Sequence, residues 1–360
     1  MIPTTKNIGS YVFGAGSFEQ LEDLLDRRLA SRSGIVAFFV DGYFEGRELN
    51  RRLPSRQIDR VVFVDTSHEP ATDQIDAYVA DLRAEGAGSV SAVVGVGGGS
   101  TLDIAKAVSN LLTNDGLAED YQGWNLVKKP GIFKIGVPTL SGTGAEASRT
   151  CVMINRRKNT KLGMNSEHTL FDQLVLDPEL TKTVPRDQYF YTGMDTFVHC
   201  VESLAGRHRH PVADAYSREA LRLCREIFLD DDMQSDTNRE KTMVASLLGG
   251  AAIANSYVGV IHPLSAGLSM VLGTPHCLAN CLVINVLGDF YPEAAEAFHE
   301  MMARQRLSLP SGLCRALPDD AYRALYEASI VHEKPLSNAL GPDFRSALTF
   351  DRVRTLFQRI

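Results

Sequence analysis

The sequence predicts an α/β domain with a parallel sheet, followed by an all-α domain. Three observations support this prediction. Short apolar runs alternate with helical patterns in the first half, strand patterns become rare after about Leu180, and 360 residues are comfortable for two domains. Strands that alternate with helices are typical of a parallel sheet covered on both faces. We therefore expect an α/β domain at residues 1–180 and an all-helical domain at residues 181–360.

The first half contains apolar runs that are typical of buried strands. They lie at 34–41, 60–65, 89–96 and 133–138. Apolar residues at helical spacing occupy 74–84, between the second and third runs, and a further helix is expected from Thr101 to about Leu112.

Helical patterns dominate the second half of the chain, and a segment at 183–185 is the expected connector. The predicted helices cover 189–205, 211–228, 239–256, 278–287, 292–305, 319–329 and 349–360.

Composition narrows the classes of function. The formal net charge of −7 argues against a nucleic-acid-binding protein, which normally carries a basic face. The apolar stretches are short for a membrane span, and the N-terminus lacks the pattern of a signal peptide. The six cysteines are scattered, as in reduced proteins. We expect a cytoplasmic protein without nucleic-acid or membrane partners.

A glycine loop follows the third apolar run and suits a phosphate group. Gly97, Gly98 and Gly99 let the backbone approach a ligand, Ser100 stands at the expected helix N-cap, and Asp103 follows three residues later. The free N–H groups of a helix N-terminus bind a pyrophosphate well. The spacing differs from G-x-G-x-x-G, so a plain strand-to-helix turn remains an alternative interpretation.

A second loop, 138–146, follows another predicted strand and contains Thr139 and Thr143. Two such loops at neighbouring strand ends are what a dinucleotide cleft requires. Asp41 ends the first strong strand, where a carboxylate can accept hydrogen bonds from a ribose diol and repel the phosphate of NADP. This favours NAD over NADP, although an ordinary exposed aspartate fits the spacing equally well.

Four side chains form a candidate metal site. Asp195 and His199 are four residues apart on one face of a predicted helix, and His262 and His276 lie in apolar surroundings. One carboxylate and three imidazoles suit Fe²⁺ or Zn²⁺. A simple hydrogen bond between Asp195 and His199 is the alternative for that pair.

These motifs together resemble the iron-containing (group III) alcohol dehydrogenase family, from about Tyr11 to about Asn285. The resemblance implies a Rossmann-like domain and a helical domain with the site between them. It implies that the two loops hold a nicotinamide dinucleotide, that Lys161 contacts its ribose, and that the four candidate residues bind the metal. Members usually form dimers or larger assemblies. Many carry a further histidine where this chain has Ala266, so the usual proton route is in doubt here.

The whole chain is similar to a subgroup of this family, the 3-deoxy-manno-octulosonate (Kdo) 8-oxidase or dehydrogenase. The resemblance implies oxidation of the C8 primary hydroxyl of Kdo in lipopolysaccharide sugar biosynthesis. Basic residues offer partners for a sugar carboxylate, with Arg149 and Arg207 as the substrate candidates, although solvated surface charge is the simpler explanation for most of these residues. The clusters are Arg149, Arg156, Arg157, Lys158 and Lys161, and Arg207, His208, Arg209 and His210.

The expected function is therefore metal-dependent oxidation of an alcohol with NAD, in a homodimer. Several alternatives stay open. The substrate could be glycerol, a diol or a simple primary alcohol. Oxygen could be the final acceptor, the reaction could be the non-redox cyclisation of dehydroquinate synthase-type enzymes, or the chain could be a non-enzymatic redox sensor.

Overall fold

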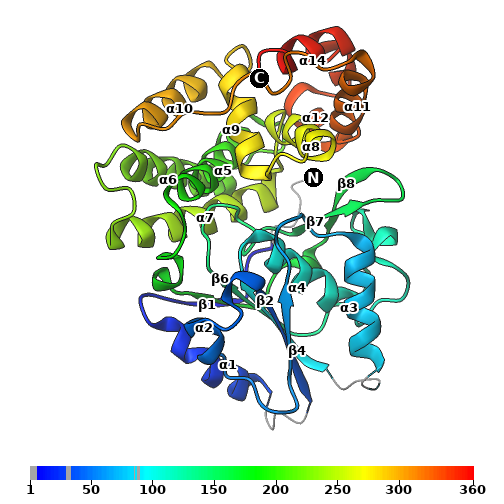
Figure 1. Cartoon of the computed structure of the whole chain (residues 1–360), viewed down its shortest axis with the longest axis vertical. Coiled ribbons are helices and arrows are strands. Elements are labelled where there is room, and N and C mark those ends of the chain that lie inside the picture. Colours follow the sequence, from blue (N-terminus) through cyan, green and yellow to red (C-terminus); the bar gives the residue numbers. More distant parts are fainter. Residues whose placement is uncertain (1–5, 30–33, 85, 87–89) are drawn as a thin grey trace. The chain divides into compact units, whose positions relative to one another are not determined.

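The computed structural model describes residues 6–29, 34–84, 86 and 90–360. These residues form two compact units. Residues 6–141 and 145–183 form what we call the sheet unit, and residues 142–144 and 184–360 form the helical unit. Both units can be followed along the chain in Figure 1.

The sheet unit is built on a six-stranded parallel sheet in the order β1-β9-β6-β4-β2-β3. This confirms the predicted parallel sheet. Its strands are β1 (Ser10–Phe13), β2 (Ile35–Asp41), β3 (Arg60–Val64), β4 (Val90–Gly97), β6 (Lys134–Pro138) and β9 (Gln173–Leu176). The two strands at one side of this order, β1 and β9, were not expected, because each is only four residues long.

The middle of the sheet is apolar on both faces, which explains the continuous apolar runs in the sequence. In β2, every residue from Val36 to Val40 is buried. The helices of this unit are α1 (Leu21–Arg28), α2 (Glu48–Arg51), α3 (Thr72–Ala84) and α4 (Gly99–Leu111), with short 3-10 turns at Ser17–Gln20, Gly42–Phe44, Ala118–Tyr121, Glu167–Thr169 and Pro178–Thr181.

A second, three-stranded sheet completes the sheet unit and was also not expected. Its order is β5 (Gly123–Trp124), β8 (Thr160–Asn165) and β7 (Thr150–Asn155). Strands β7 and β8 are antiparallel, and a turn at 156–159 joins them. That turn is polar and basic, so the sequence pattern there indicates only a cluster of charges.

The helical unit contains ten α-helices among its described residues. They are α5 (Arg186–Ala205), α6 (Pro211–Phe228), α7 (Asp236–Ser256), α8 (Ile261–Leu272), α9 (His276–Val286), α10 (Pro292–Arg304), α11 (Asp319–Ile330), α12 (Glu333–Leu340), α13 (Phe344–Ala347) and α14 (Phe350–Phe357). The predicted helical character is confirmed. Helices α8, α12 and α13 were missed; α8 opens with Ile261-His262-Pro263, a segment that lacks the usual start signals.

Helix α5 runs through the core of the helical unit, with most of its side chains buried, and it packs against α6, α7 and α9. Among the described residues, no single helix combines the length and the apolar character needed to cross a membrane. Helices α7 and α8 meet those limits only as a pair, and that pair is bent by 103°.

Candidate metal centre and strand-end loops

Helix α5 presents three ionisable side chains on one buried face. Asp195, His199 and Glu202 are four and three residues apart, so they lie over successive turns. All three are buried, and the Asp195 and Glu202 side chains are fully so. Polar groups placed this deep need partners that compensate for lost hydration.

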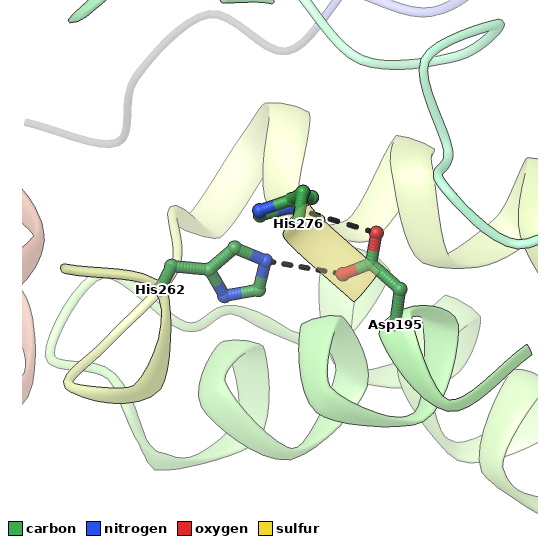
Figure 2. A group of neighbouring side chains, drawn as sticks. All are labelled: Asp195, His262 and His276. Atoms are coloured by element: carbon green, nitrogen blue, oxygen red, sulfur yellow. Dashed lines mark ion pairs between the residues drawn. The ribbon is translucent and has the colours of Figure 1, made fainter. Parts of the chain in front are cut away.

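Two histidines from other helices complete the cluster. His262 lies in the first turn of α8, and His276 is the first residue of α9. Figure 2 shows both imidazoles turned toward the Asp195 carboxylate. The Nε2 atom of His262 is 3.3 Å from Asp195 Oδ1, and that of His276 is 3.6 Å from Asp195 Oδ2.

The spacing of these atoms suits a single small cation. One nitrogen or oxygen from each of Asp195, His262 and His276 lies within 4.8 Å of the other two. His199 stands beside this group: its Nε2 atom is 3.5 Å from Asp195 Oδ1, and its ring stacks on that of His262 with centroids 4.7 Å apart. The structure thus brings together all four residues that the sequence singled out, with three of them in the tightest group.

Two further residues, which the sequence analysis missed, contact this cluster. The Oε2 atom of Glu202 lies 2.5 Å from His262 Nδ1. Asn280 donates its amide to Asp195 Oδ1 at 2.7 Å, and the same nitrogen is 3.5 Å from His262 Nε2 and 3.3 Å from His276 Nε2. Helical spacing was the available signal, because Asn280 follows His276 by four residues and Glu202 follows His199 by three.

Burial and neighbouring charges shift the pKa values of Asp195, His199 and His262 in different directions. Burial alone raises the pKa of Asp195, but the nearby His199, His276 and His262 outweigh it and hold that pKa far below the usual range. Burial lowers the pKa of His199 to about 4, against the opposing pull of Asp195. Burial also lowers the pKa of His262, but the Glu202 and Asp195 carboxylates raise it to about 9. A positive charge is therefore favoured beside the Asp195 and Glu202 carboxylates.

The donor set fits a divalent transition metal. One carboxylate and three imidazoles are ligands for both Fe²⁺ and Zn²⁺. Within the described part of the chain, two buried polar atoms here, Asn280 Oδ1 and His199 Nδ1, have no hydrogen-bond partner. Buried polar atoms without a partner are rare in folded proteins, and a bound ion is one of the explanations for them.

In the sheet unit, three predicted cofactor residues lie together at the carboxyl ends of neighbouring strands. Asp41 ends β2 and Gly97 ends β4. A Cβ atom on Gly97 would lie 3.0 Å from Asp41 Cβ and 2.6 Å from Thr101 Oγ1, so glycine is required for this approach. The amide of Thr139 donates to Gly97 O at 3.0 Å. Strand ends of this kind are where open parallel sheets bind ligands.

The predicted cap of the following helix is wrong. Helix α4 begins at Gly99, with Gly98 as its N-cap, so Ser100 lies inside the first turn. The carboxylate of Asp103 accepts from Val152 N at 2.8 Å and lies 3.2 Å from Lys106 Nζ. Burial raises the pKa of Asp103 in spite of Lys106. Asp103 thus joins α4 to β7, and it does not form the predicted capping box.

The second loop divides between the two units. Residues 142–144, including Thr143, belong to the helical unit, and the amides of Gly142 and Gly144 donate to the Ser246 hydroxyl at 2.8 and 3.2 Å. These two N–H groups therefore serve the fold of the helical unit. The Lys161 ammonium, in the sheet unit, is 2.6 Å from Glu69 Oε1.

The basic cluster proposed for a sugar carboxylate is largely paired with acids of its own unit. Arg156 lies 2.9 Å from Asp73, while Arg157 and Lys158 both reach Glu119. Arg149, the substrate candidate here, donates to the Asn125 side chain at 3.2 Å. In the helical unit, Arg207 is exposed, and its backbone amide donates to Asn338 O at 2.9 Å.

Comparison with known proteins identifies related sequences for both halves of the chain. Residues 9–178 match the family model described as iron-containing alcohol dehydrogenase, and residues 189–327 match the C-terminal model of the same family. Together the two matches cover well over half of the chain.

Two relatives show how far the similarity extends. Sulfoacetaldehyde reductase of Bilophila wadsworthia is 34% identical over 237 residues, which are 65% of this chain and 60% of the relative. The NAD-dependent methanol dehydrogenase of Bacillus methanolicus is 27% identical over 75% of this chain and 71% of that enzyme. The first alignment thus spans less than two thirds of the relative. Both relatives are oxidoreductases of the alcohol–aldehyde type.

Solved structures share the fold along nearly the whole chain. A sulfoacetaldehyde reductase from Bifidobacterium kashiwanohense in complex with NAD⁺ has a TM-score of 0.81 at 23% identity, covering 99% of this chain and 98% of its own. A 1,3-propanediol oxidoreductase has a TM-score of 0.83 at 21% identity and 99% coverage of both chains.

Proposed function

The chain belongs to the iron-containing alcohol dehydrogenase family, and on this premise we propose that it interconverts an alcohol and its aldehyde or ketone with a metal and NAD. The observation that carries the proposal is the convergence of Asp195, His262 and His276, with His199 beside them, in the core of the helical unit.

The proposed metal ligands are Asp195, His199, His262 and His276. The residues accept Fe²⁺ and Zn²⁺ alike. A bound metal supplies Lewis-acid polarisation of the substrate oxygen, and bound NAD accepts the hydride. The protein contributes an ionised carboxylate that reduces the net charge of the site, and a neutral His199 whose low pKa keeps it unprotonated at neutral pH.

The proposed cofactor site consists of Asp41, Gly97, Gly98, Gly99, Ser100, Asp103, Thr139, Thr143 and Lys161. Support is strongest for Asp41, Gly97 and Thr139, which lie together at the strand ends. It is weakest for Asp103, whose oxygens already accept from Val152 and Lys106. Asp41 favours NAD over NADP, because a carboxylate accepts from a ribose diol and repels a 2′-phosphate.

The proposed substrate class is a small alcohol or aldehyde. The narrower proposal, the C8 hydroxyl of Kdo in lipopolysaccharide biosynthesis, rests on overall resemblance, and the pairing of Arg156, Arg157 and Lys158 with acids removes much of its physical support. Sulfoacetaldehyde, the substrate in the name of one relative, also carries an anionic group. Arg149 and Arg207 remain the candidates for an anionic substrate.

We also propose a cytoplasmic homodimer. The six cysteines are unpaired and buried, which suits a reducing compartment. Strand β1 lies at one edge of the parallel sheet, and its Tyr11 and Phe13 side chains are 57% and 43% exposed. The amides of Ser10 and Gly14 donate to carbonyl groups of the neighbouring β9 segment. Successive N–H groups of a strand point to opposite sides, so those of Tyr11 and Phe13 point to the open edge.

An uncharged strand with an open edge is suited to pairing with its own copy. A two-fold axis at Val12 would set Tyr11 of one protomer against Phe13 of the other, so the exposed aromatic rings would cover each other on one face of the joined sheet. This arrangement is isologous, since the same four residues serve both protomers.

The proposed activity is tested by NADH absorbance with purified protein, Fe²⁺ or Zn²⁺, and a panel of Kdo, sulfoacetaldehyde (with NADH), propanediol, glycerol and butanol. Metal-dependent turnover supports the function, and the substrate that turns over fixes the class. Oxygen uptake without NADH release would point to an oxidase. Turnover of a sugar phosphate without net redox change would point to a cyclase, and NAD binding without any turnover to a sensor.

Replacement of a ligand makes the test specific. We expect His276→Ala to lose bound metal and activity together, whereas His299→Ala, an exposed histidine bonded to Asn285 on the surface, should keep both. Full activity of metal-free His276→Ala would refute the metal assignment.

A further inference from the structure

A buried carboxylate outside the proposed ligand set holds the orientation of one ligand. Glu202 has no exposed surface, and both of its oxygens contact residues in the first turn of α8. Its Oε1 accepts from Ile261 N at 2.5 Å, and its Oε2 lies 2.5 Å from His262 Nδ1. A buried carboxylate with these two partners is tied to one place.

The contact with His262 fixes which ring nitrogen carries the proton. A carboxylate can only accept, so the Nδ1 atom must donate to it, and whenever the ring is neutral its lone pair lies on Nε2. That Nε2 atom is the one turned toward Asp195, 3.3 Å from Oδ1. Glu202 therefore selects the tautomer and the ring direction that a metal ligand needs.

The backbone that leads to His262 is also held in place. Val260 N lies 3.3 Å from the Tyr291 hydroxyl, so the residues before His262 are held by Glu202 and by Tyr291. A Cβ atom on Gly259 would lie 2.7 Å from the Tyr291 hydroxyl and 3.1 Å from Glu202 Oε1. Only glycine leaves room for both oxygen atoms there.

We propose that Glu202 is a positioning residue: it orients His262 for the metal and sets the affinity of the site without being a ligand itself. The inference rests on the proposed function, because it concerns the same metal centre. It adds to that function a residue that tunes the site through His262 alone.

The test measures the binding of Zn²⁺ alone and the visible absorption of bound Co²⁺, which reports the ligands and their geometry. Glu202→Gln keeps the shape of the side chain, but its amide group must face either the Ile261 amide or the His262 ring as a donor. We expect a 10- to 100-fold loss of Zn²⁺ affinity, as is typical when such an outer partner is removed, together with an altered Co²⁺ spectrum. Glu202→Asp, which keeps the charge, should recover part of the affinity.

The matched control is Asp214→Asn. This residue is also a buried carboxylate of the helical unit, but it pairs with Arg209 at 2.6 Å and Arg218 at 3.7 Å. We expect it to bind Zn²⁺ like the unmodified protein. Melting temperatures of the metal-free forms identify any variant that loses affinity through unfolding.

A double-mutant cycle separates positioning from a general structural role. If Glu202 acts through His262, Glu202→Gln should cost little further affinity in a His262→Ala background, whereas an independent structural effect should persist unchanged. Unaltered Zn²⁺ affinity in Glu202→Gln, or an equal loss in both backgrounds, would overturn the inference while leaving the metal site in place. Failure of the unmodified protein to bind metal would overturn the proposed function as well.

Discussion

The amide nitrogen of Asn280 lies 2.7 Å from the Oδ1 atom of Asp195 and within 3.5 Å of two of the imidazoles around it. Asn280 is fully buried on α9, one turn after His276. A single neutral side chain therefore donates to the carboxylate of the proposed ligand set and approaches both His262 and His276.

Removal of this amide should weaken the metal site. Asn280→Ala leaves Asp195 without its shortest hydrogen bond, so its orientation is less well fixed, and we expect metal affinity to fall by about tenfold. Equilibrium competition with a chelator measures the change. Asn285→Ala, on the same helix but bonded to His299, is the control. Equal affinities in the two variants would show that the Asn280 contact does not support the site.

The nucleotide preference should depend on Asp41. This carboxylate accepts from Tyr43 N at 3.0 Å and from Thr66 Oγ1 at 3.1 Å, and it lies beside Gly97. We expect Asp41→Ala to raise the ratio of kcat/KM for NADP to that for NAD by about tenfold or more, equivalent to about 1.4 kcal/mol. Asp65→Ala, at the end of β3, is the matched control and should leave the ratio unchanged.

The proposed dimer predicts a specific cross-link. With the two-fold axis at Val12, the two copies of Val12 face each other as a non-hydrogen-bonded pair, with Cα atoms about 4.5 Å apart. That separation accepts a disulfide. We expect Val12→Cys to form a covalent dimer under mild oxidation, because the six native cysteines are buried and do not compete. Non-reducing gels measure the product.

The control for this cross-link is Ile58→Cys, which replaces another exposed apolar side chain, 51% exposed, away from β1. It should remain monomeric on the same gel. The mass in solution provides a second measurement, since Phe13→Lys should shift the protein toward the monomer by placing like charges across the axis. An unchanged mass for Phe13→Lys would count against β1 as the interface.

A buried lysine should make stability depend on pH. Burial lowers the pKa of Lys134 to about 8 from 10.5, although Asp172 at 4.0 Å opposes the shift. Between these values the folded protein has released a proton that the unfolded chain still binds, so the contribution of Lys134 to stability rises with pH. Below about pH 8 the lysine is charged in both states, and its burial costs free energy.

Lys134→Met should therefore be more stable than the unmodified protein at neutral pH, by on the order of 2–3 kcal/mol. The difference should narrow as the pH rises toward 10.5. Urea unfolding of both proteins at several pH values measures it. A constant difference across this range would show that Lys134 is not the group responsible.

Much of the fold follows from local patterns. The buried strand β2 was predicted at 34–41 and extends over Ile35–Asp41, and the helix predicted at 211–228 is α6, which begins at Pro211 and ends at Phe228. Both have a strong signal within a short window, a continuous apolar run or an apolar stripe after an N-terminal proline. The four-residue strands β1 and β9 have no such signal, and only their neighbours in the sheet define them.

The candidate site likewise contains some residues that local patterns predict and others that only the fold brings together. The sequence by itself determined which residue types could bind a metal, since Asp195 and His199 share a helix face and His262 and His276 stand in apolar surroundings. Only the tertiary structure decided that Glu202 contacts His262 and that Asn280 contacts Asp195. The same holds for the hydrogen bond between Asp103 and Val152 of β7. It also holds for the hydrogen bonds from the Gly142 and Gly144 amides to Ser246. The physical reason is that a hydrogen bond depends on the position of its partner in space, and these partners lie 49 to 104 residues away along the chain.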